Sequence, residues 1–146
     1  AKTIIVMVGP QASGKSTLAK YLSDKYKLNV INNDLQGSKV NKIFKEYLIS
    51  ESNGIIIDNT NPQSEKRNKW FQKVPDNWHK LVIWIDIPKS VSIHMMKNRM
   101  QYGGSKMSLI PIHCYYKRFE PPTDVDIIKI DNVISNYNID HTLRFI

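Results

Sequence analysis

The chain has 146 residues, with 21 Lys or Arg against 13 Asp or Glu, which gives a formal net charge of +8. This length fits one domain, and the charge favours an anionic partner, nucleic acid ahead of membrane. A basic surface that only aids solubility remains open. A single cysteine, Cys114, excludes an intramolecular disulfide and favours an intracellular location, cytoplasmic or nuclear. The apolar runs have only strand length, so neither a signal peptide nor a membrane span is expected.

Strand and helix patterns alternate along the chain. Apolar β-branched runs are typical of strands buried on both faces of a parallel sheet, and apolar residues three or four apart indicate helices with one buried face. Strands are expected at 4–8, 28–32, 55–57, 81–85 and 127–130, and helices at 15–26, 38–48, 62–74, 88–100 and 111–119. The first helix should bury Leu18, Leu22 and Tyr26, and Asn61 before Pro62 predicts a capped helix start. Ser38 is the expected N-cap of the second helix.

Two stretches fall outside this alternation. Gly103 and Gly104 lie between basic residues, which predicts a mobile flap over residues 102–109. Residues 132–146 form a tail that could add an edge strand or dock on the body of the protein. The chain is therefore expected to be one α/β domain over residues 1–146, a mostly parallel five-stranded sheet with helices on both faces and a mobile lid.

Residues 9–17, read GPQASGKST, match the pattern GxxxxGK[ST] of the phosphate-binding loop. The match lies between a predicted strand and a predicted helix, where such a loop binds phosphate through its backbone N–H groups and the helix N-terminus. Lys15 would reach the β- and γ-phosphates, and the Ser16 hydroxyl would bind Mg²⁺. The expected ligand is ATP with Mg²⁺, and the residues expected to bind the nucleotide are Gly9, Gln11, Ala12, Ser13, Gly14, Lys15, Ser16 and Thr17.

Polar clusters follow the first three predicted strands. They are residues 9–17, Asn33 with Asp34, and residues 58–61. Ligands of open parallel sheets bind beyond the carboxyl ends of the strands. The three clusters should therefore converge on one cleft.

Five ordered motifs carry a family resemblance. They are the phosphate loop, Asn32–Asp34 with Gly37 and Ser38, the sequence IIIDNTNP at 55–62, KNRM at 97–100 and YYKRFEPPT at 115–123. Together they resemble the 5′-kinase domain of polynucleotide kinases, in particular the kinase half of the animal polynucleotide kinase/phosphatase family. The resemblance runs from Thr3 to Ile130. It implies the P-loop kinase fold and the transfer of the ATP γ-phosphoryl group to the 5′-hydroxyl of DNA or RNA, in nucleic acid repair or RNA end healing.

The same resemblance assigns catalytic roles. Asp34 matches the general base, although an Asp before a helix is also a common cap. Asp58 ends a hydrophobic strand and would hold either the Mg²⁺ water shell or a lid arginine. Arg99 matches that lid arginine and would bind ATP and clamp the migrating phosphoryl group.

On the substrate side, the resemblance places Arg67 and Lys69 at the nucleic-acid backbone and Thr60 at the 5′ nucleotide, while a plain surface helix would explain Lys69 equally well. Adenine would lie against the lid helix and the loop at 117–122. Two departures stand out. Asn33 occupies a substrate-side position where relatives carry an arginine, and the lid between Arg99 and residue 111 is short.

Two other functions stay open. A small-metabolite or nucleoside kinase would share the fold, the phosphate loop and the aspartate, but the basic charge and the DNTNP segment speak against it. A nucleotide-binding module without transferase activity is the other alternative, and the presence of Asp34 speaks against that one.

Overall fold

The computed structural model describes residues 1–103 and 108–142 of the chain. Within that part, five strands form one sheet in the order β2-β3-β1-β4-β5, and every neighbouring pair is parallel. The predicted α/β class is confirmed, with a sheet that is parallel throughout. The strands are β1 (Thr3–Val8), β2 (Asn29–Ile31), β3 (Gly54–Ile57), β4 (His79–Ile85) and β5 (Asp126–Ile130).

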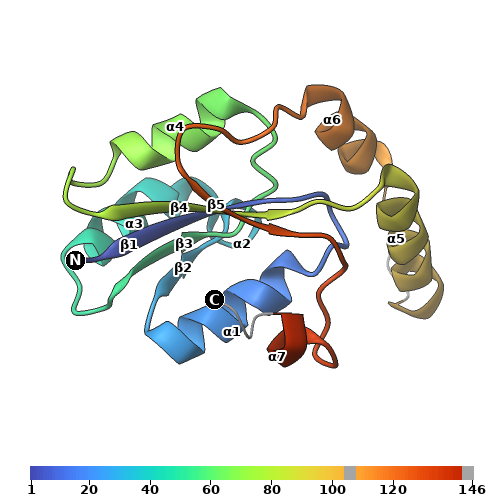
Figure 1. Ribbon diagram of the computed structural model, residues 1–146, viewed down its shortest axis with the longest axis horizontal. Coiled ribbons are helices and arrows are strands. Elements are labelled where there is room, and N and C mark those ends of the chain that lie inside the picture. Colours follow the sequence, from blue (N-terminus) through green and yellow to red (C-terminus); the bar gives the residue numbers. More distant parts are fainter. Residues whose placement is uncertain (104–107, 143–146) are drawn as a thin grey trace.

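Helices cover both faces of the sheet, with α3 and α4 on one face and α1 and α7 on the other (Figure 1). In the described part of the chain, no helix has the length and apolar character needed to cross a bilayer. The helical segments are α1 (Lys15–Tyr26), α2 (Asn33–Gln36), the 3₁₀ turn η1 (Gly37–Lys39), α3 (Val40–Leu48), α4 (Ser64–Gln72), α5 (Lys89–Gly103), α6 (Ile110–Arg118) and α7 (Ile139–Thr142).

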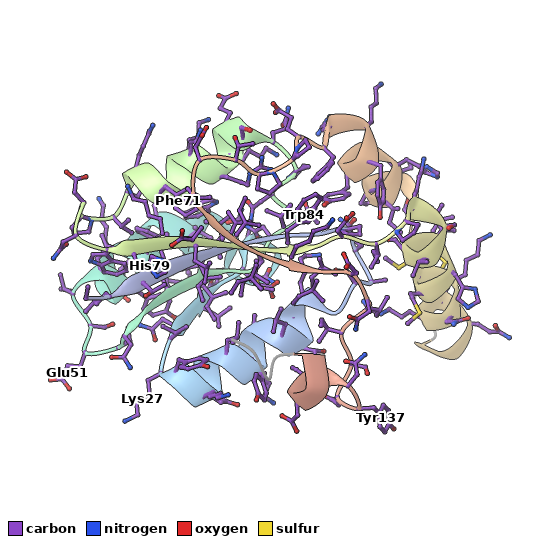
Figure 2. All side chains as sticks on the ribbon, in the orientation of Figure 1. Lys27, Glu51, Phe71, His79, Trp84 and Tyr137 are labelled. Carbon is purple, nitrogen blue, oxygen red and sulfur yellow. The ribbon has the colours of Figure 1, made fainter. Side chains whose placement is uncertain are left out.

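The central strand β1 supplies both cores because successive side chains point to opposite faces. Ile4 and Val6 pack with the aromatic residues of α3, α4 and α6, and Ile5 and Met7 pack with Leu18 and other residues of α1. Phe71 points from α4 toward the sheet (Figure 2) and is 5% exposed. Burial on both faces explains why β1 reads as a continuous apolar run.

Several predicted boundaries shift for local reasons. The helix expected at 38–48 begins as the 3₁₀ turn η1 and continues as α3, and the short helix α2 precedes it, with φ +53° at Gly37 between them. Ser38 lies inside η1 and is not the N-cap of α3, which is Lys39. Asn61 does not cap a helix. It has φ +47°, it is buried, and its side-chain amide donates to the Met7 carbonyl at 2.8 Å, so α4 begins only at Ser64. Tyr26 is 36% exposed, so the buried face of α1 rests on Leu18, Ala19 and Leu22.

The tail was expected either to add an edge strand or to dock on the body of the protein. Its described residues dock on the body. Residues 133–142 form a loop and α7, and Ile134 and Ile139 enter the core on the α1 face. Of the predicted flap, residues 102–103 end α5, and residues 104–107 lie outside the described residues.

Gly54 provides a test of how tightly β3 approaches β1. It has φ +152°, and a Cβ placed there would overlap the Thr3 carbonyl oxygen. Gly54→Ala should therefore lower the free energy of unfolding by about 2–4 kcal/mol, measured by urea denaturation. Gly37 is the matched control, because it has φ +53° and a Cβ placed there would meet nothing within 4 Å. Gly37→Ala should lose only about 1 kcal/mol, and equal losses at the two positions would contradict the close approach.

Candidate functional site

The phosphate loop connects β1 to α1 and is held from both sides. Inside the loop, Ser13 Oγ donates to the Pro10 carbonyl at 2.8 Å, and Lys15 Nζ donates to the same carbonyl at 2.6 Å. From outside, the Ile134 N–H donates to the Ser13 carbonyl at 2.9 Å. Gly14 has φ +91°, and a Cβ there would overlap the Ile134 carbonyl, so only glycine fits this contact. These contacts fix the backbone of a loop whose sequence is typical of phosphate binding through N–H groups.

Asp58 follows β3 and faces the start of α1. It is 6% exposed, and one of its carboxylate oxygens accepts hydrogen bonds from Ser16 Oγ at 2.9 Å and Asn32 Nδ2 at 3.2 Å. A serine hydroxyl beside a carboxylate offers two hard oxygen ligands.

This donor set fits a magnesium ion held jointly with nucleotide phosphates. Among residues 1–103 and 108–142, no group of three or more His, Cys, Asp and Glu gathers that could hold a metal by itself. Mg²⁺ commonly takes one or two protein carboxylates and fills its other positions with phosphate oxygens and water. The Ser16 and Asp58 oxygens satisfy that requirement.

A cavity of about 330 Å³, called here the phosphate cavity, lies over the loop. Arg99 and Met96 reach it from α5, and Asp58 and Thr60 reach it from the segment after β3. Gly9 and Ser13, both buried, are not among its lining residues. Of the predicted site residues, the phosphate cavity brings together Gln11, Ala12, Gly14, Lys15, Ser16, Thr17, Asp58, Thr60 and Arg99.

A second cavity of about 380 Å³, called here the lysine cavity, adjoins the first. The two cavities share Gln11, Asn59 and Thr60 in their walls. The far wall of the lysine cavity belongs to α4 and its C-terminal end, and it carries three lysines, Lys66, Lys69 and Lys73. Asn33 and Lys69 were predicted from the sequence, whereas Lys66 and Lys73 were not. Their spacing from Lys69 places all three on one helix face, which was the signal available.

Asp34 belongs to α2, next to Asn33 in the wall of the lysine cavity. The backbone N–H of Asn33 donates to Asn59 Oδ1 at 3.1 Å, and the Asn32 N–H donates to Gln36 Oε1 at 2.8 Å. These bonds fix α2 beside the wall that the two cavities share. The role of Asp34 as a base stays a prediction, and its side chain lies outside the described part of the structure.

Arg67 does not occupy the position expected for a residue that binds a nucleic-acid backbone. It is 3% exposed and donates to the Asn61 carbonyl at 2.9 Å, the Glu120 carbonyl at 2.7 Å and Ser64 Oγ at 3.1 Å. Burial lowers the pKa of its guanidinium, and the charge of Glu120 opposes that shift. Arg67 precedes Phe71 by four residues, so the helical spacing already placed it on the buried face of α4. Its geometry favours a structural role.

The loop at residues 117–122 packs against the start of α4. The Glu120 N–H donates to the Pro62 carbonyl at 2.8 Å, and the Glu120 carboxylate accepts from the Ser64 N–H at 3.3 Å. The placement of adenine against this loop and the lid helix stays a prediction. The phosphate loop itself is contacted by Ile134, in the segment that follows β5.

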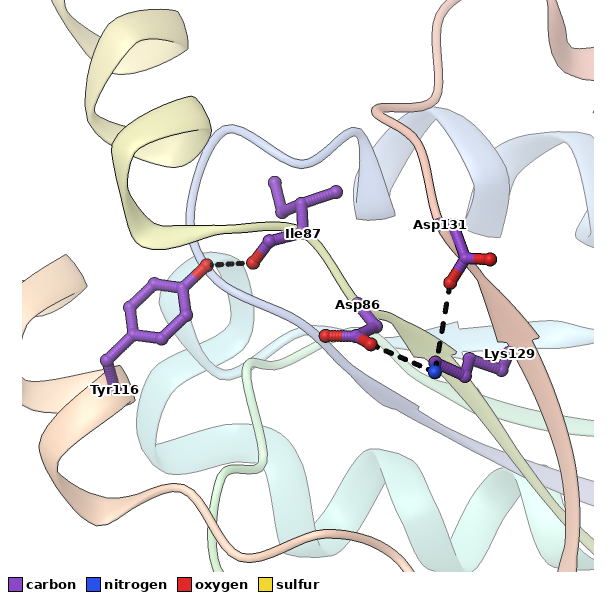
Figure 3. Close-up of polar contacts among 5 residues, drawn as sticks. All are labelled: Asp86, Ile87, Tyr116, Lys129 and Asp131. Atoms are coloured by element: carbon purple, nitrogen blue, oxygen red, sulfur yellow. Dashed lines mark hydrogen bonds and ion pairs between the residues drawn. The ribbon is translucent and has the colours of Figure 1, made fainter.

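The segment just before α5, the helix that carries Arg99, is held by side-chain contacts from α6 and β5. Tyr116 of α6 donates its hydroxyl hydrogen to the Ile87 carbonyl at 2.6 Å, just before α5 begins (Figure 3). Burial, together with the Asp86 carboxylate, raises the pKa of Tyr116 to about 12, so the donor stays protonated at neutral pH. Asp86 also pairs with Lys129 of β5 at 3.1 Å (Figure 3). These contacts tie α5 to α6 and to the sheet edge.

The fold and the loop define a P-loop protein of the kinase type, a fold that implies ATP binding. A family described as an AAA domain matches residues 4–122, and the chain belongs to that family. No curated protein sequence matches the chain.

Solved structures share this fold at low identity. A gluconokinase from Sinorhizobium meliloti 1021 has a TM-score of 0.68 and 15% identity, covering 97% of this chain and 87% of that one. A fungal RNA kinase has a TM-score of 0.67 and 16% identity, covering 94% and 77%. Kti12 from Chaetomium thermophilum, in complex with ADP-AlF3, has a TM-score of 0.66 and 14% identity, covering 95% and 94%.

The buried position of Arg67 predicts a large effect on stability. Arg67→Met leaves the Asn61 and Glu120 carbonyls without their donor and should lower the free energy of unfolding by about 2–4 kcal/mol in urea denaturation. Lys69→Met is the matched control on the same helix, because Lys69 is exposed and its pair with Glu65 is exposed as well. It should change stability by about 0.5 kcal/mol or less. A small effect at Arg67 would contradict the structural role.

Proposed function

We propose that the protein transfers the γ-phosphoryl group of ATP to the 5′-hydroxyl end of DNA or RNA. The observation that carries the proposal is the pair of adjoining cavities, one over the phosphate loop and one lined by three lysines. A phosphoryl donor in the first cavity and an anionic acceptor in the second would meet at the shared wall of Gln11, Asn59 and Thr60. Phosphoryl transfer needs donor and acceptor side by side and in line, and adjoining cavities give them room to meet.

On the donor side, the loop N–H groups bind the phosphates and Lys15 neutralises charge on the β- and γ-phosphates. Arg99, in the opposite wall of the phosphate cavity, contributes a planar guanidinium for the oxygens of the transferring group. When Mg²⁺ is bound by Ser16 and Asp58, it supplies further positive charge at the phosphate oxygens.

On the acceptor side, the Asp34 carboxylate takes the proton of the 5′-hydroxyl. The hydroxyl oxygen forms a bond to the γ-phosphorus while the bond between that phosphorus and the ADP oxygen breaks. The products are ADP and a 5′-phosphate end, and the proton remains on Asp34 until solvent takes it. The position of the α2 backbone beside the shared wall supports this role.

Thr60, Asn33 and Lys69 then contact the terminal nucleotide and the next phosphate, with Lys66 and Lys73 in the same wall. Contacts with phosphate position a strand without reading its bases, so we expect broad sequence tolerance. Arg67 is buried and is therefore not one of the residues that contact the substrate. It instead holds the Asn61–Pro62 turn beside Thr60.

A small-metabolite kinase is the second candidate. The lysine cavity has about 380 Å³, a volume within the range of small-molecule pockets, and a small anionic acceptor would fit among its lysines. The fold shared with a gluconokinase is compatible with this function.

The proposed reaction is tested by transfer of labelled γ-phosphate from ATP to a 5′-hydroxyl oligonucleotide. The same oligonucleotide with a 5′-phosphate, a free nucleoside and a hexose serve as acceptor controls. We expect label only on the 5′-hydroxyl oligonucleotide, and a loss of about 10³-fold in kcat for Asp34→Asn. Asp24→Asn on the exposed side of α1 is the matched control and should retain activity. Labelling of the nucleoside or hexose alone would support the small-metabolite kinase instead.

Magnesium dependence tests Asp58 separately. Asp58→Asn removes the anionic ligand while keeping a similar shape, so the gain in ATP affinity that Mg²⁺ provides should shrink about tenfold, equivalent to about 1.4 kcal/mol. Titration calorimetry of ATP, with Mg²⁺ and with a chelator, measures that gain directly. An unchanged ratio of the two dissociation constants would remove Asp58 from the metal site.

A further inference from the structure

The three lysines of the lysine cavity form a row along α4. Lys66, Lys69 and Lys73 are separated by three and four residues, which places them on one face of the helix and its C-cap. From the first to the last, the row rises about 10 Å at 1.5 Å per residue. Among the side chains that the structure describes, Lys69 pairs with Glu65 at 3.6 Å, and both are well exposed, so that pair is weak. Among the described lining residues, the row is therefore dominated by positive charge.

The row continues beyond the lysine cavity. Lys73 also lines a third cavity of about 290 Å³ between α3 and α4, together with Asn41, Phe44, Lys45 and Leu48. Lys73 Nζ lies 3.3 Å from Asn41 Oδ1 and 4.5 Å from the centre of the Trp70 ring. These contacts hold the ammonium where the two helices meet, at the boundary between the second and third cavities.

The phosphate cavity, the lysine cavity and the α3–α4 cavity therefore form a series in which each shares residues with the next. Gln11, Asn59 and Thr60 join the first two, and Lys73 joins the last two. Lys45 extends the positive charge onto α3, where it is exposed. The α3 and α4 helices lie on the same face of the sheet (Figure 1), so the series runs over one side of the molecule.

We propose that this series, from Lys66 through Lys73 to Lys45, binds the sugar-phosphate backbone of a single nucleic-acid strand beyond its 5′-terminal nucleotide. The inference rests on the proposed function and extends it to the length of the substrate. A row of about 10 Å along α4, continued onto α3 by Lys45, reaches beyond the first phosphate after the terminal nucleotide. A small acceptor would end in the lysine cavity and leave Lys45 without a role.

The contacts along the series are with phosphates. Trp70 and Phe44 are 9% and 3% exposed, and the Lys73 ammonium lies over both rings, so these aromatics serve the core. Base stacking would need an accessible ring. The strand is therefore held through its charge, and the affinity should fall steeply with salt.

The test neutralises the far end of the series. Lys45→Gln/Lys73→Gln is compared with Lys20→Gln/Lys27→Gln, which removes the same charge from exposed positions on α1 and its C-cap across the sheet. Lys27 lies at the end of α1 farthest from the phosphate loop (Figure 2). Lys45→Gln alone is included because Lys73 also contributes to packing, and thermal unfolding checks each variant. Binding of 5′-phosphorylated dinucleotide and octanucleotide is measured by fluorescence anisotropy at several salt concentrations.

We expect the parent protein to bind the octanucleotide at least about tenfold more tightly than the dinucleotide at low salt. The Lys45→Gln/Lys73→Gln variant should lose most of that ratio, and its salt slope should fall by about 1.4, at 0.7 per phosphate contact on a single strand. The Lys20→Gln/Lys27→Gln control should match the parent in the affinity ratio and in the salt slope.

Equal affinity for the two lengths in the parent, or equal behaviour of the two double variants, would overturn the proposal. So would an octaglutamate peptide that binds as tightly as the octanucleotide and loses affinity in the same variant, because an acidic protein would then be the better partner. The transfer assay is read separately. Length-dependent binding without transfer to any 5′-hydroxyl would count against the proposed reaction while supporting the strand-binding surface.

Discussion

The central strand β1 is paired on both edges and buried on both faces, and this constraint determines where chemistry is possible. Neither its backbone nor its side chains are available to a ligand, so only the turn at its carboxyl end can bind one. The parallel neighbours end at the same edge of the sheet, which brings Asp58 from β3 and Asn32 from β2 to the phosphate loop. Because β4 leads into α5, Arg99 also reaches this edge.

The wall shared by the two cavities depends on a buried charge. A guanidinium taken out of water must find acceptors, and Arg67 finds them in backbone carbonyls at Asn61 and Glu120. The Asn61 side chain in turn bonds to Met7 at the end of β1. Segments far apart in the sequence, after β3 and after α6, are thereby joined at one point. The position of Thr60 in the cavity wall follows from these buried hydrogen bonds of its neighbour Asn61.

The sheet class and the position of each strand, to within about two residues, could be predicted from the sequence. The cluster around the phosphate loop could be predicted as well, because periodicity and the loop pattern are local signals. Prediction from the sequence was wrong where contacts between distant segments determine the position of a side chain. Arg67 shares the helical face of Phe71 and is buried, yet the family resemblance had placed it at the nucleic-acid backbone. Asn61 resembled a helix cap but forms a left-handed turn that binds β1. The lysine cavity could not be predicted, since it depends on how α4 is placed against the Asn33 segment.

The contact between Ile134 and the phosphate loop joins the last part of the described chain to the first. Such a contact closes a very long loop of chain, so the entropy lost in closing it must be offset by the packing around it. During synthesis, residues 9–17 leave the ribosome before the segment around Ile134. Until that segment has followed, the Ser13 carbonyl lacks the N–H of Ile134 as its donor. The conformation of the phosphate loop therefore depends on a segment that is synthesised about 120 residues later.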